Sequence, residues 1–353
     1  MIRLKDIAER AGVSIMTVSK VMRDAPDISA ATKVRVRALA QQMGYVPDSA
    51  AQGLRTRTTK LFGLVVSAMT NPIFARVVMA IEERAHELGY EVILSHTLNI
   101  PEREDVAIRR LISRRIDGLF ISPVYRLTPE ATIYQDLQRC GIPTIILGHR
   151  APFCSQFANV ETDDIQASYS ITQHLLQLGH KRIAFFVGPQ ASPWAQERVE
   201  GYRRALREAE IEVDDKLVFN AGGTIEEGEK AALQMLNEKT ETTAVQAVND
   251  LVAIGAADVF LNQGIRIPDD LSIAGFGNVL ISEYFRVPLT TIRQPKFRLG
   301  VAAMNSMLKL MRGERPEPKR LAAEIVVRAS TAAPSTARRA YQNPVEKTEN
   351  PTL

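Results

Sequence analysis

Residues 15–20, with the sequence IMTVSK, carry a mixture of side chains that suits contact with a nucleic acid. Val18 and Val21 lie three residues apart and can supply the buried stripe of a short helix. The other side chains then face outward: Ile15, Met16, Thr17, Ser19 and Lys20. Exposed apolar groups at the start of a helix can contact thymine methyl groups in a DNA major groove, and hydroxyl and ammonium groups can bind phosphates or base edges. Ile15 and Met16 could instead pack partly against a preceding helix.

The surrounding residues predict that this segment is the second helix of a helix-turn-helix. A first helix is indicated by apolar residues at helical spacing: Leu4, Ile7, Ala8 and Ala11. Gly12 is suited to ending that helix, and Ser14 can cap the next one by accepting a hydrogen bond from a backbone N–H.

A third helix is predicted from an N-cap at Ser29 to about Met43. Its inward side chains are expected to be Val34, Ala38 and Leu39. Its outward side chains are expected to be Lys33, Arg35 and Arg37.

The charge of the chain is unevenly distributed. Lys and Arg outnumber Asp and Glu by 11 to 5 in residues 1–60, whereas the remaining residues carry 33 against 35. All the excess positive charge therefore lies in the first sixth of the chain. A small basic module attached to a near-neutral body indicates a polyanion partner for the module, although a solvated basic surface would give the same count.

The length and composition predict a cytoplasmic protein of two or three domains. A chain of 353 residues is longer than one typical domain. The sequence has no apolar run that could serve as a signal peptide or as a membrane span of roughly 20 residues. Cys140 and Cys154 lack CxxC spacing and a nearby pair of histidines, so we expect neither a disulfide nor a metal site.

No catalytic motif is present in the sequence. GxSxG, HExxH, a Walker loop and GxGxxG after a strand are all missing, and the five histidines are scattered. We therefore expect neither enzymatic activity nor a cofactor. His174 and His180, in the segment HLLQLGHKR, are expected to be structural.

Motifs along nearly the whole chain resemble the lactose/galactose repressor (LacI/GalR) family of bacterial transcription regulators. The N-terminal ones are DIAERAGVSIMTVSKVM and SAATKVRVRALAQQMGYVPDSAAQGL. The later ones are LGYEVIL, RRIDGLFIS, HLLQLGHKRIAFFVG, RVEGYRRAL, VNDLVAIGA, IPDDLSIAGFG and PLTTIRQP. The resemblance implies a homodimeric repressor that binds a pseudo-palindromic operator in double-stranded DNA under the control of a small-molecule effector.

The resemblance also implies a set of DNA-binding residues. Ile15, Met16 and Lys20 fall at positions that read base edges, and Thr17, Ser29 and Thr32 at positions that touch phosphates. The complete expected set is Ser14, Ile15, Met16, Thr17, Lys20, Ser29, Thr32, Ala51 and Leu54.

Residues 48–60 are expected to form a hinge. The segment SAAQGLRT is rich in Ala but contains Gly53, which makes a helix this short marginal by itself. In the family such a hinge folds on the operator, and a leucine matching Leu54 wedges into the minor groove and bends the DNA. A plain flexible linker is the alternative.

The rest of the chain predicts two doubly wound parallel α/β subdomains. Apolar strand candidates separated by amphipathic helices are 62–66, 91–94, 118–122, 144–147, 183–187, 245–248 and 272–276. The fold class is therefore α/β, with an N-terminal helix-turn-helix domain and a body similar to periplasmic binding proteins. The expected boundaries are 1–47 for the DNA-binding domain, 61–160 with 291–322 for one subdomain, 161–290 with 323–333 for the other, and 334–353 for a disordered tail. The tail has no apolar heptads, which favours a dimer over a tetramer.

Ligands bind such folds at the carboxyl ends of the strands, in a cleft between the subdomains. The effector-binding residues implied by the resemblance are Asn71, Ile73, Phe74, Asp163, Trp194, Arg198, Asn249, Asp250 and Asn278. Arg198 could instead form a surface salt bridge with Glu197 or Glu200.

Some of these positions leave a second interpretation open. Asn249 and Asp250 could cap a helix, and Trp194 could be a packing residue. The sequence departs from the family at Gly277, where an acid is usual, and at Gly223, where an aromatic is common.

The expected effector is a sugar or a sugar acid, and the loss of the acid at Gly277 favours a ligand with negative charge. Whether the effector releases DNA or promotes its binding is left open. A solute-binding protein would need a signal peptide, and a sugar-processing enzyme would need paired carboxylates or a metal cluster.

Overall fold

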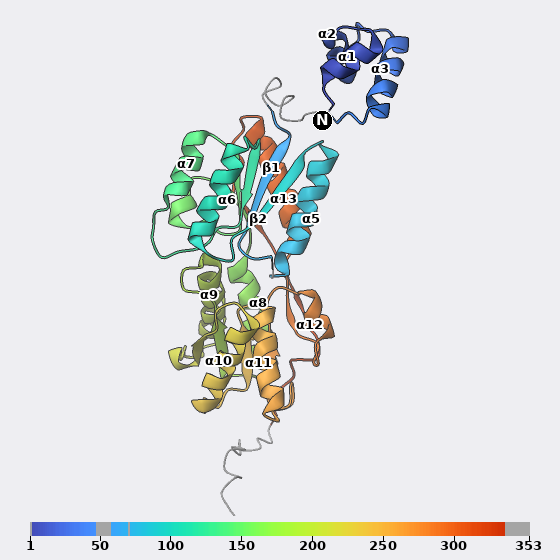
Figure 1. Cartoon of the computed structure of the whole chain (residues 1–353). Helices are drawn as coiled ribbons and strands as arrows, with labels where there is room; N and C mark the ends of the chain where they lie inside the picture. The colour runs from blue at the N-terminus through green and yellow to red at the C-terminus, as the bar shows by residue number, and fades with distance from the viewer. Residues whose placement is uncertain (1, 47–57, 70, 336–353) are drawn as a thin grey trace, which may run out of the picture. The chain divides into compact units, whose positions relative to one another are not determined.

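The computed structural model describes residues 2–46, 58–69 and 71–335, and it divides the chain into two compact units, residues 1–59 and 60–353 (Figure 1). Among these residues no helix is both long and apolar enough to cross a membrane. The predicted tail falls almost wholly outside the described part of the chain.

The first unit is a bundle of three helices, α1 (Leu4–Ala11), α2 (Ile15–Met22) and α3 (Ala30–Gln42). Gly12 ends α1 with a left-handed φ of 63°, a conformation that glycine adopts without a steric penalty. The Ser14 and Ser29 hydroxyls accept hydrogen bonds from the backbone N–H of Thr17 and Thr32 and so cap α2 and α3. The predicted helix-turn-helix is confirmed.

The predicted inward face of α3 is wrong in part. Val34 is 69% exposed and Ala38 is also exposed, whereas Val36 and Ala40 are buried against the other helices and Leu39 is partly buried. Val36 and Ala40 are four residues apart and share a face, and Val34 lies about 200° around the helix from Val36. The prediction chose the wrong valine.

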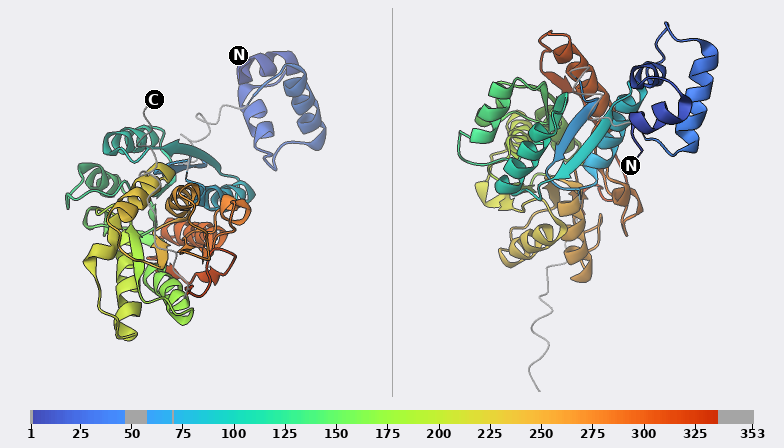
Figure 2. Two further views of the ribbon diagram at one scale, coloured as in Figure 1. Left: turned by 90° about the horizontal axis from the view of Figure 1, so that it is seen from below. Right: turned by 45° about the horizontal axis from the view of Figure 1, so that its top comes forward.

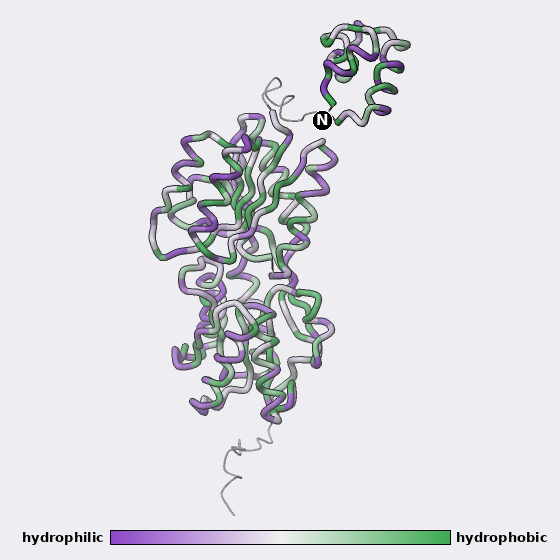
Figure 3. Tube along the Cα trace, in the orientation of Figure 1, coloured by the Kyte–Doolittle hydropathy of each residue, from purple (hydrophilic) through white to green (hydrophobic). Residues whose placement is uncertain are grey.

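The second unit contains a six-stranded parallel sheet. Its strands, in spatial order, are β11 (Lys319–Leu321), β5 (Ala158–Thr162), β4 (Thr144–Leu147), β3 (Gly118–Ile121), β1 (Leu61–Val66) and β2 (Glu91–His96). The helices that cover it are α5 (Ile73–Glu87) and α13 (Lys296–Met311) on one face, and α6 (Pro101–Ser113) and α7 (Thr132–Cys140) on the other. Phe62 and Leu64 pack toward α5 and α13, whereas Val65 packs toward α6 and α7. Both faces of the central strands β1, β3 and β4 are therefore buried, as their continuous apolar runs predict (Figure 3).

A second parallel sheet, of four strands, lies farther along the chain. Its strands, in spatial order, are β7 (Val218–Asn220), β6 (Ile183–Val187), β8 (Ala244–Ala247) and β9 (Ser272–Ala274). The helices that cover it are α8 (Asp164–Gln177) and α9 (Pro193–Glu208) on one face, and α10 (Ile225–Asn237) and α11 (Asp250–Asn262) on the other. The same layering can be followed in the two views of Figure 2.

The remaining elements are short. They are the helix α12 (Leu280–Tyr284), the antiparallel strands β10 (Thr291–Arg293) and β12 (Glu324–Val326), and the 3-10 turns η1 (Pro152–Cys154) and η2 (Asp215–Leu217). The chain passes between the two sheets near residues 162–164, 293–296 and 321–324. We name the body around the six-stranded sheet the first subdomain and the body around the four-stranded sheet the second. This arrangement confirms the predicted α/β fold class, and the residue boundaries of the domains stay a prediction.

Candidate functional site

The outward face of α2 is apolar at its start and polar beyond it. Ile15 is 49% exposed and Met16 is 63% exposed, so neither side chain is taken up by packing against α1. Val18 and Val21 are fully buried and fix the side of α2 that faces the bundle. The surface has the composition that major-groove reading requires, and contact of these residues with DNA stays a prediction.

The N-termini of α2 and α3 carry the same arrangement of two hydroxyl groups. Ser14 and Thr17 have their hydroxyl oxygens 2.9 Å apart, and so do Ser29 and Thr32. Each pair lies beside backbone N–H groups at a helix N-terminus, where a phosphate is favourably bound. This repeat supports the expected phosphate contacts of Thr17, Ser29 and Thr32.

The structure adds acidic partners that the sequence analysis did not find. Lys20 forms a salt bridge with Asp27, and the hydrogen bond from Lys20 lowers the pKa of Asp27. Lys20 must therefore exchange this exposed carboxylate for a base edge if it binds DNA. Ala51 and Leu54 lie outside the described residues.

In the second unit, Arg198 forms a buried ion pair between α9 and α8. Its Nε and Nη2 lie 3.0 and 2.9 Å from Oδ1 of Asp164, and its Nη1 donates to the carbonyl oxygen of Val248 at 2.6 Å. The guanidinium also stacks on Phe276, 3.5 Å from the ring centroid, and on Trp194 at 4.7 Å. Burial raises the pKa of Asp164, and the charge of Arg198 acts against it.

The alternative interpretation of Arg198 as a surface salt bridge with Glu197 or Glu200 is therefore wrong. Arg198 is only 6% exposed, and Glu200 pairs with Arg207 instead. The true partner, Asp164, lies 34 positions earlier in the chain.

Glu197 joins the two subdomains. Its Oε2 lies 2.9 Å from Nε2 of His149, which follows β4, and its Oε1 accepts a hydrogen bond of 2.6 Å from Nη2 of Arg320 in β11. His149 also lies 3.6 Å from Asp164 and 4.0 Å from Glu161. Burial alone would lower the pKa of His149, but the hydrogen bond to Glu197 and the nearby carboxylates raise it above its ordinary value.

A second contact between the subdomains is made by Lys296 at the start of α13. Its Nζ donates to the carbonyl oxygen of Asn278 at 2.8 Å. The side chain of Asn278 accepts a hydrogen bond of 2.7 Å from Arg328. Burial lowers the pKa of Lys296 to about 8, although the charge of Asp250 acts against that shift.

Several predicted effector-binding residues support the backbone nearby. Asn249 caps α11 by accepting from Val252 N–H at 2.8 Å, so its interpretation as a cap is confirmed. Asp250 is 1% exposed and accepts hydrogen bonds from the Thr291 hydroxyl and the Val279 N–H, and burial raises its pKa.

The other predicted residues lie at helix starts. Asp163 caps α8, and Asn71 accepts a hydrogen bond of 3.2 Å from Ile73 N–H as α5 begins. Phe74 packs on the core of the first subdomain, and Trp194 packs on the core of the second while it faces Arg198.

The structure thus brings Trp194 together with Arg198, and Asp250 together with Asn278 through Val279. We name the region where these residues and the contacts between the subdomains lie the junction. It also contains four residues that were not predicted from the sequence: His149, Glu197, Lys296 and Arg320. Their positions could have indicated a role in the site. His149 directly follows β4, and Glu197 lies in the first turns of α9, so both lie at the carboxyl ends of strands.

Two family descriptions match this chain. Residues 3–48 match "Bacterial regulatory proteins, lacI family", and residues 59–331 match "Periplasmic binding proteins and sugar binding domain of LacI family".

Individual relatives agree over almost the whole length. The HTH-type transcriptional regulator DegA of Bacillus subtilis is 31% identical over 94% of this chain and 98% of its own. The HTH-type transcriptional repressor CytR of Escherichia coli is 32% identical over 94% of this chain and 96% of its own. Among solved structures, the lac repressor dimer bound to operator and the anti-inducer ONPF is 28% identical, covers 94% of this chain and 99% of its own, and superposes with a TM-score of 0.82.

Proposed function

Because the chain belongs to the LacI family of bacterial regulatory proteins, we propose that it is a transcriptional repressor whose affinity for a specific operator is set by a small polar metabolite. The observation that carries this function is the capped helix α2, which leaves Ile15 and Met16 exposed on a basic three-helix unit. The unit has the charge for phosphates and the side chains for base edges.

The operator should consist of two half-sites related by two-fold symmetry. DNA fragments retained by the purified protein can be sequenced to identify it. Met16→Ala should then change the preferred bases, because Met16 is expected to contact base edges, whereas Leu233→Ala, which alters an exposed apolar residue on α10, should not. Unchanged base preferences for Met16→Ala would contradict this reading of α2.

The effector-binding site that we propose is the junction. A guanidinium has five N–H groups, and Arg198 donates one to Asp164 and one to Val248 while its Nη2 also lies close to Asp164, so at least two donors remain. Since Asp164 balances the charge of Arg198, these donors suit sugar hydroxyls, and Lys296 offers a cation for the carboxylate of a sugar acid.

Fluorescence of Trp194, the only tryptophan, can report on ligand binding because its ring faces Arg198. We would titrate sugars and sugar acids with and without operator. Arg198→Lys, which keeps a cation beside Asp164 but removes the planar donors, should weaken binding of the best ligand at least about tenfold. Arg204→Lys on the exposed side of α9 is the matched control, and equal binding by both variants would place the effector elsewhere.

Effector and operator should change each other's affinity by the same factor, typically about 5 to 150 fold. The lac repressor structure holds operator and an anti-inducer at once, which supports such coupling here. Equal affinity of the ligand for free and operator-bound protein would contradict the coupling.

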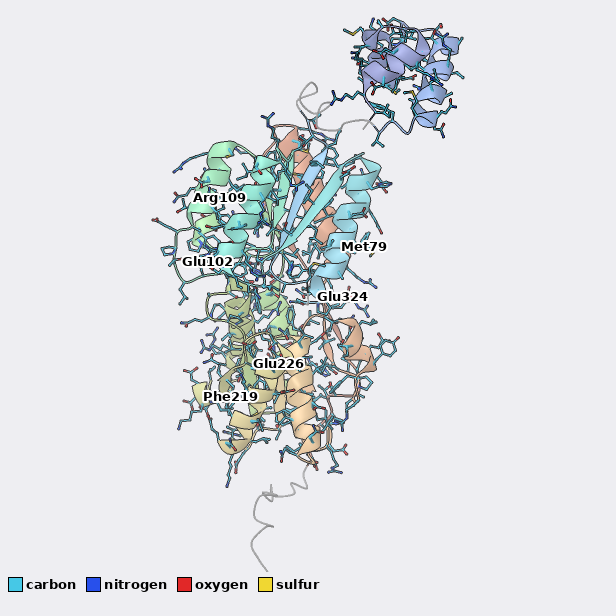
Figure 4. The ribbon with its side chains drawn as sticks, in the orientation of Figure 1. Met79, Glu102, Arg109, Phe219, Glu226 and Glu324 are labelled. Atoms are coloured by element: carbon cyan, nitrogen blue, oxygen red, sulfur yellow. The ribbon has the colours of Figure 1, made fainter. Side chains whose placement is uncertain are left out.

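A homodimer is proposed from exposed apolar side chains on one side of the second unit. α12 contributes Leu280, Ile281 and Tyr284, and α5 contributes Met79, which Figure 4 shows on the same side as α12. Tyr284 is 76% exposed, an unusual position for a large aromatic residue in a monomer.

We also propose that the protein acts in the cytoplasm, because a regulator of DNA must reach the chromosome. We propose in addition that it acts without catalysis.

A further inference from the structure

Positive side chains gather where the helices of the first subdomain end. The strands of the six-stranded sheet are parallel, so all of them begin at one edge, and the helices that return from their carboxyl ends finish there. α6 is followed by Arg114, and α13 is followed by Arg312 and Arg315, all of them exposed. We name the edge carrying Arg114, Arg312 and Arg315 the basic edge.

Contacts within the second unit place these three residues at the same end of the sheet. Gly118 begins β3, and a Cβ there would lie 2.6 Å from the sulfur of Met307, so the last turns of α13 reach the start of the sheet. Arg114 precedes β3 by only a few residues at the end of α6 on the opposite face of the sheet. The basic edge therefore includes both helical layers.

The chain enters the second unit at the basic edge. Lys60 N–H donates to Oδ2 of Asp117 at 3.0 Å, and Asp117 N–H donates to the carbonyl oxygen of Leu61 at 2.8 Å. Residues 47–57 join the described parts of the two units. Any DNA that the first unit binds is therefore attached to the same chain as the basic edge, which raises the effective concentration of DNA phosphates for that edge.

The three arginines lack ion-pair partners in the described part of the chain, since no salt bridge joins them to a carboxylate there. Their neighbours Arg109 and Arg139 differ, because both pair with Asp136 at 2.9 and 3.3 Å. Arg109, labelled in Figure 4, lies on α6 and reaches Asp136 of α7. Helix dipoles favour cations in the last turn of a helix, but Arg315 lies four residues beyond the last residue of α13, outside the range of that effect.

The positive charge of the basic edge is also opposite in sign to the net charge of the second unit. Residues 61–353 carry 33 Lys and Arg against 35 Asp and Glu, a slight excess of negative charge. A local excess of unpaired arginine on such a body is the electrostatic pattern of a phosphate-binding surface.

We propose that the basic edge binds backbone phosphates of the operator DNA and so adds a second, sequence-independent contact to that of the helix-turn-helix. This inference rests on the proposed DNA-binding function. The contact raises operator affinity and its salt dependence, and it leaves base preference to α2.

The test compares two triple variants of the full-length protein on the operator duplex, by fluorescence anisotropy over a range of salt concentrations. The first variant is Arg114→Gln, Arg312→Gln and Arg315→Gln. The matched control removes three exposed cations from the second subdomain: Lys181→Gln, Lys216→Gln and Lys239→Gln. Circular dichroism melting of each variant verifies that it is folded.

The first variant should reduce the slope of log affinity against log salt by up to about 5, because the dimer loses six arginines and each lost phosphate contact removes about 0.9. Affinity at low salt should fall tenfold or more, while the ratio of operator to random-sequence binding stays within about twofold. The control should match wild type. Equal slopes for the two variants would overturn the proposal and leave the basic edge to another anionic partner, whereas absence of operator binding by wild type would instead overturn the proposed function.

Discussion

His149 and Glu197 come from different subdomains, and Nε2 of His149 lies 2.9 Å from Oε2 of Glu197. The other oxygen of the same carboxylate binds Arg320, which is again in the first subdomain. One carboxylate of α9 therefore contacts an imidazole and a guanidinium of the first subdomain, and we expect it to help fix the angle between the subdomains.

The first prediction concerns Glu197. Glu197→Gln removes the charge that holds His149 and Arg320, so the free energy of unfolding should fall by about 1–3 kcal/mol in urea titrations. Glu200→Gln is the matched control, because Glu200 lies on the same helix and pairs with Arg207 at the exposed surface. It should change stability by less than about 1 kcal/mol. Similar losses for the two variants would show that the contact across the junction stabilises the fold no more than an exposed ion pair does.

The second prediction concerns pH. The folded protein raises the pKa of His149 above its ordinary value of 6.5, so folding favours the protonated imidazole. Its stabilising contribution is therefore fully present below pH 6.5 and is lost as the pH rises through the raised pKa. The difference in unfolding free energy between wild type and His149→Gln should be larger at pH 6 than at pH 8.5. A difference that grows with pH would contradict this sign. Comparison with the variant is needed because burial lowers the pKa of His180, which acts in the opposite direction.

The third prediction concerns the buried pair of Arg198 and Asp164. Arg198→Ala leaves the Asp164 carboxylate buried without its guanidinium, which should cost about 3–5 kcal/mol of stability in chemical denaturation. Arg204→Ala removes an exposed pair with Glu208 on the same helix and should cost less than about 1 kcal/mol. If both variants unfold at the same denaturant concentration, the pair contributes nothing beyond a surface contact.

The fourth prediction concerns assembly. Tyr284→Asp places a charge on the apolar side of α12 and should convert the dimer to monomers in sedimentation velocity, with a loss of operator affinity. Leu127→Asp is the control, since Leu127 is 75% exposed on the loop between β3 and α7, away from α12. A dimer that persists in Tyr284→Asp would exclude this surface.

The fifth prediction concerns Leu54 in the expected hinge. Leu54→Ala should weaken operator binding by about 1 kcal/mol or more and reduce DNA bending, because the wedge that unstacks the central base pairs is gone. Non-specific binding and dimerisation should be unaffected. Gel-shift assays with circularly permuted operator fragments measure operator affinity and DNA bending. If both are unaltered, the segment is a plain linker.

The parts of the fold that could be predicted are those whose pattern is local. β4 and β6 occupy the predicted residues, because TIIL and IAFFV are uninterrupted apolar runs. β5 was missed because Asn159 and Glu161 alternate with apolar residues and gave no such run. The helices of the first unit could be predicted from their caps. The buried face of α3 could not, because Val34 and Val36 are equally apolar and only Val36 is buried.

The site was less predictable than the fold. Family resemblance located Arg198 but not its partner, because the Asp164 contact depends on how α8 packs beside α9. The contact of Glu197 with Arg320 joins residues 123 positions apart, and no local pattern indicates such a pair. The ion pairs of Glu197 join segments that are distant in the sequence, so they depend on the tertiary structure alone.

The position of β11 has a consequence for how the chain matures during synthesis. β11 adds to β5 in the first sheet, yet its residues, 319–321, follow the whole of the second sheet in the sequence. A ribosome must therefore translate the whole four-stranded sheet of the second subdomain before α13 and β11 can complete the first one. We expect fragments that stop before residue 296 to expose the apolar face that α13 covers, and so to be recovered as aggregates or as clients of chaperones rather than as an independent half of the protein.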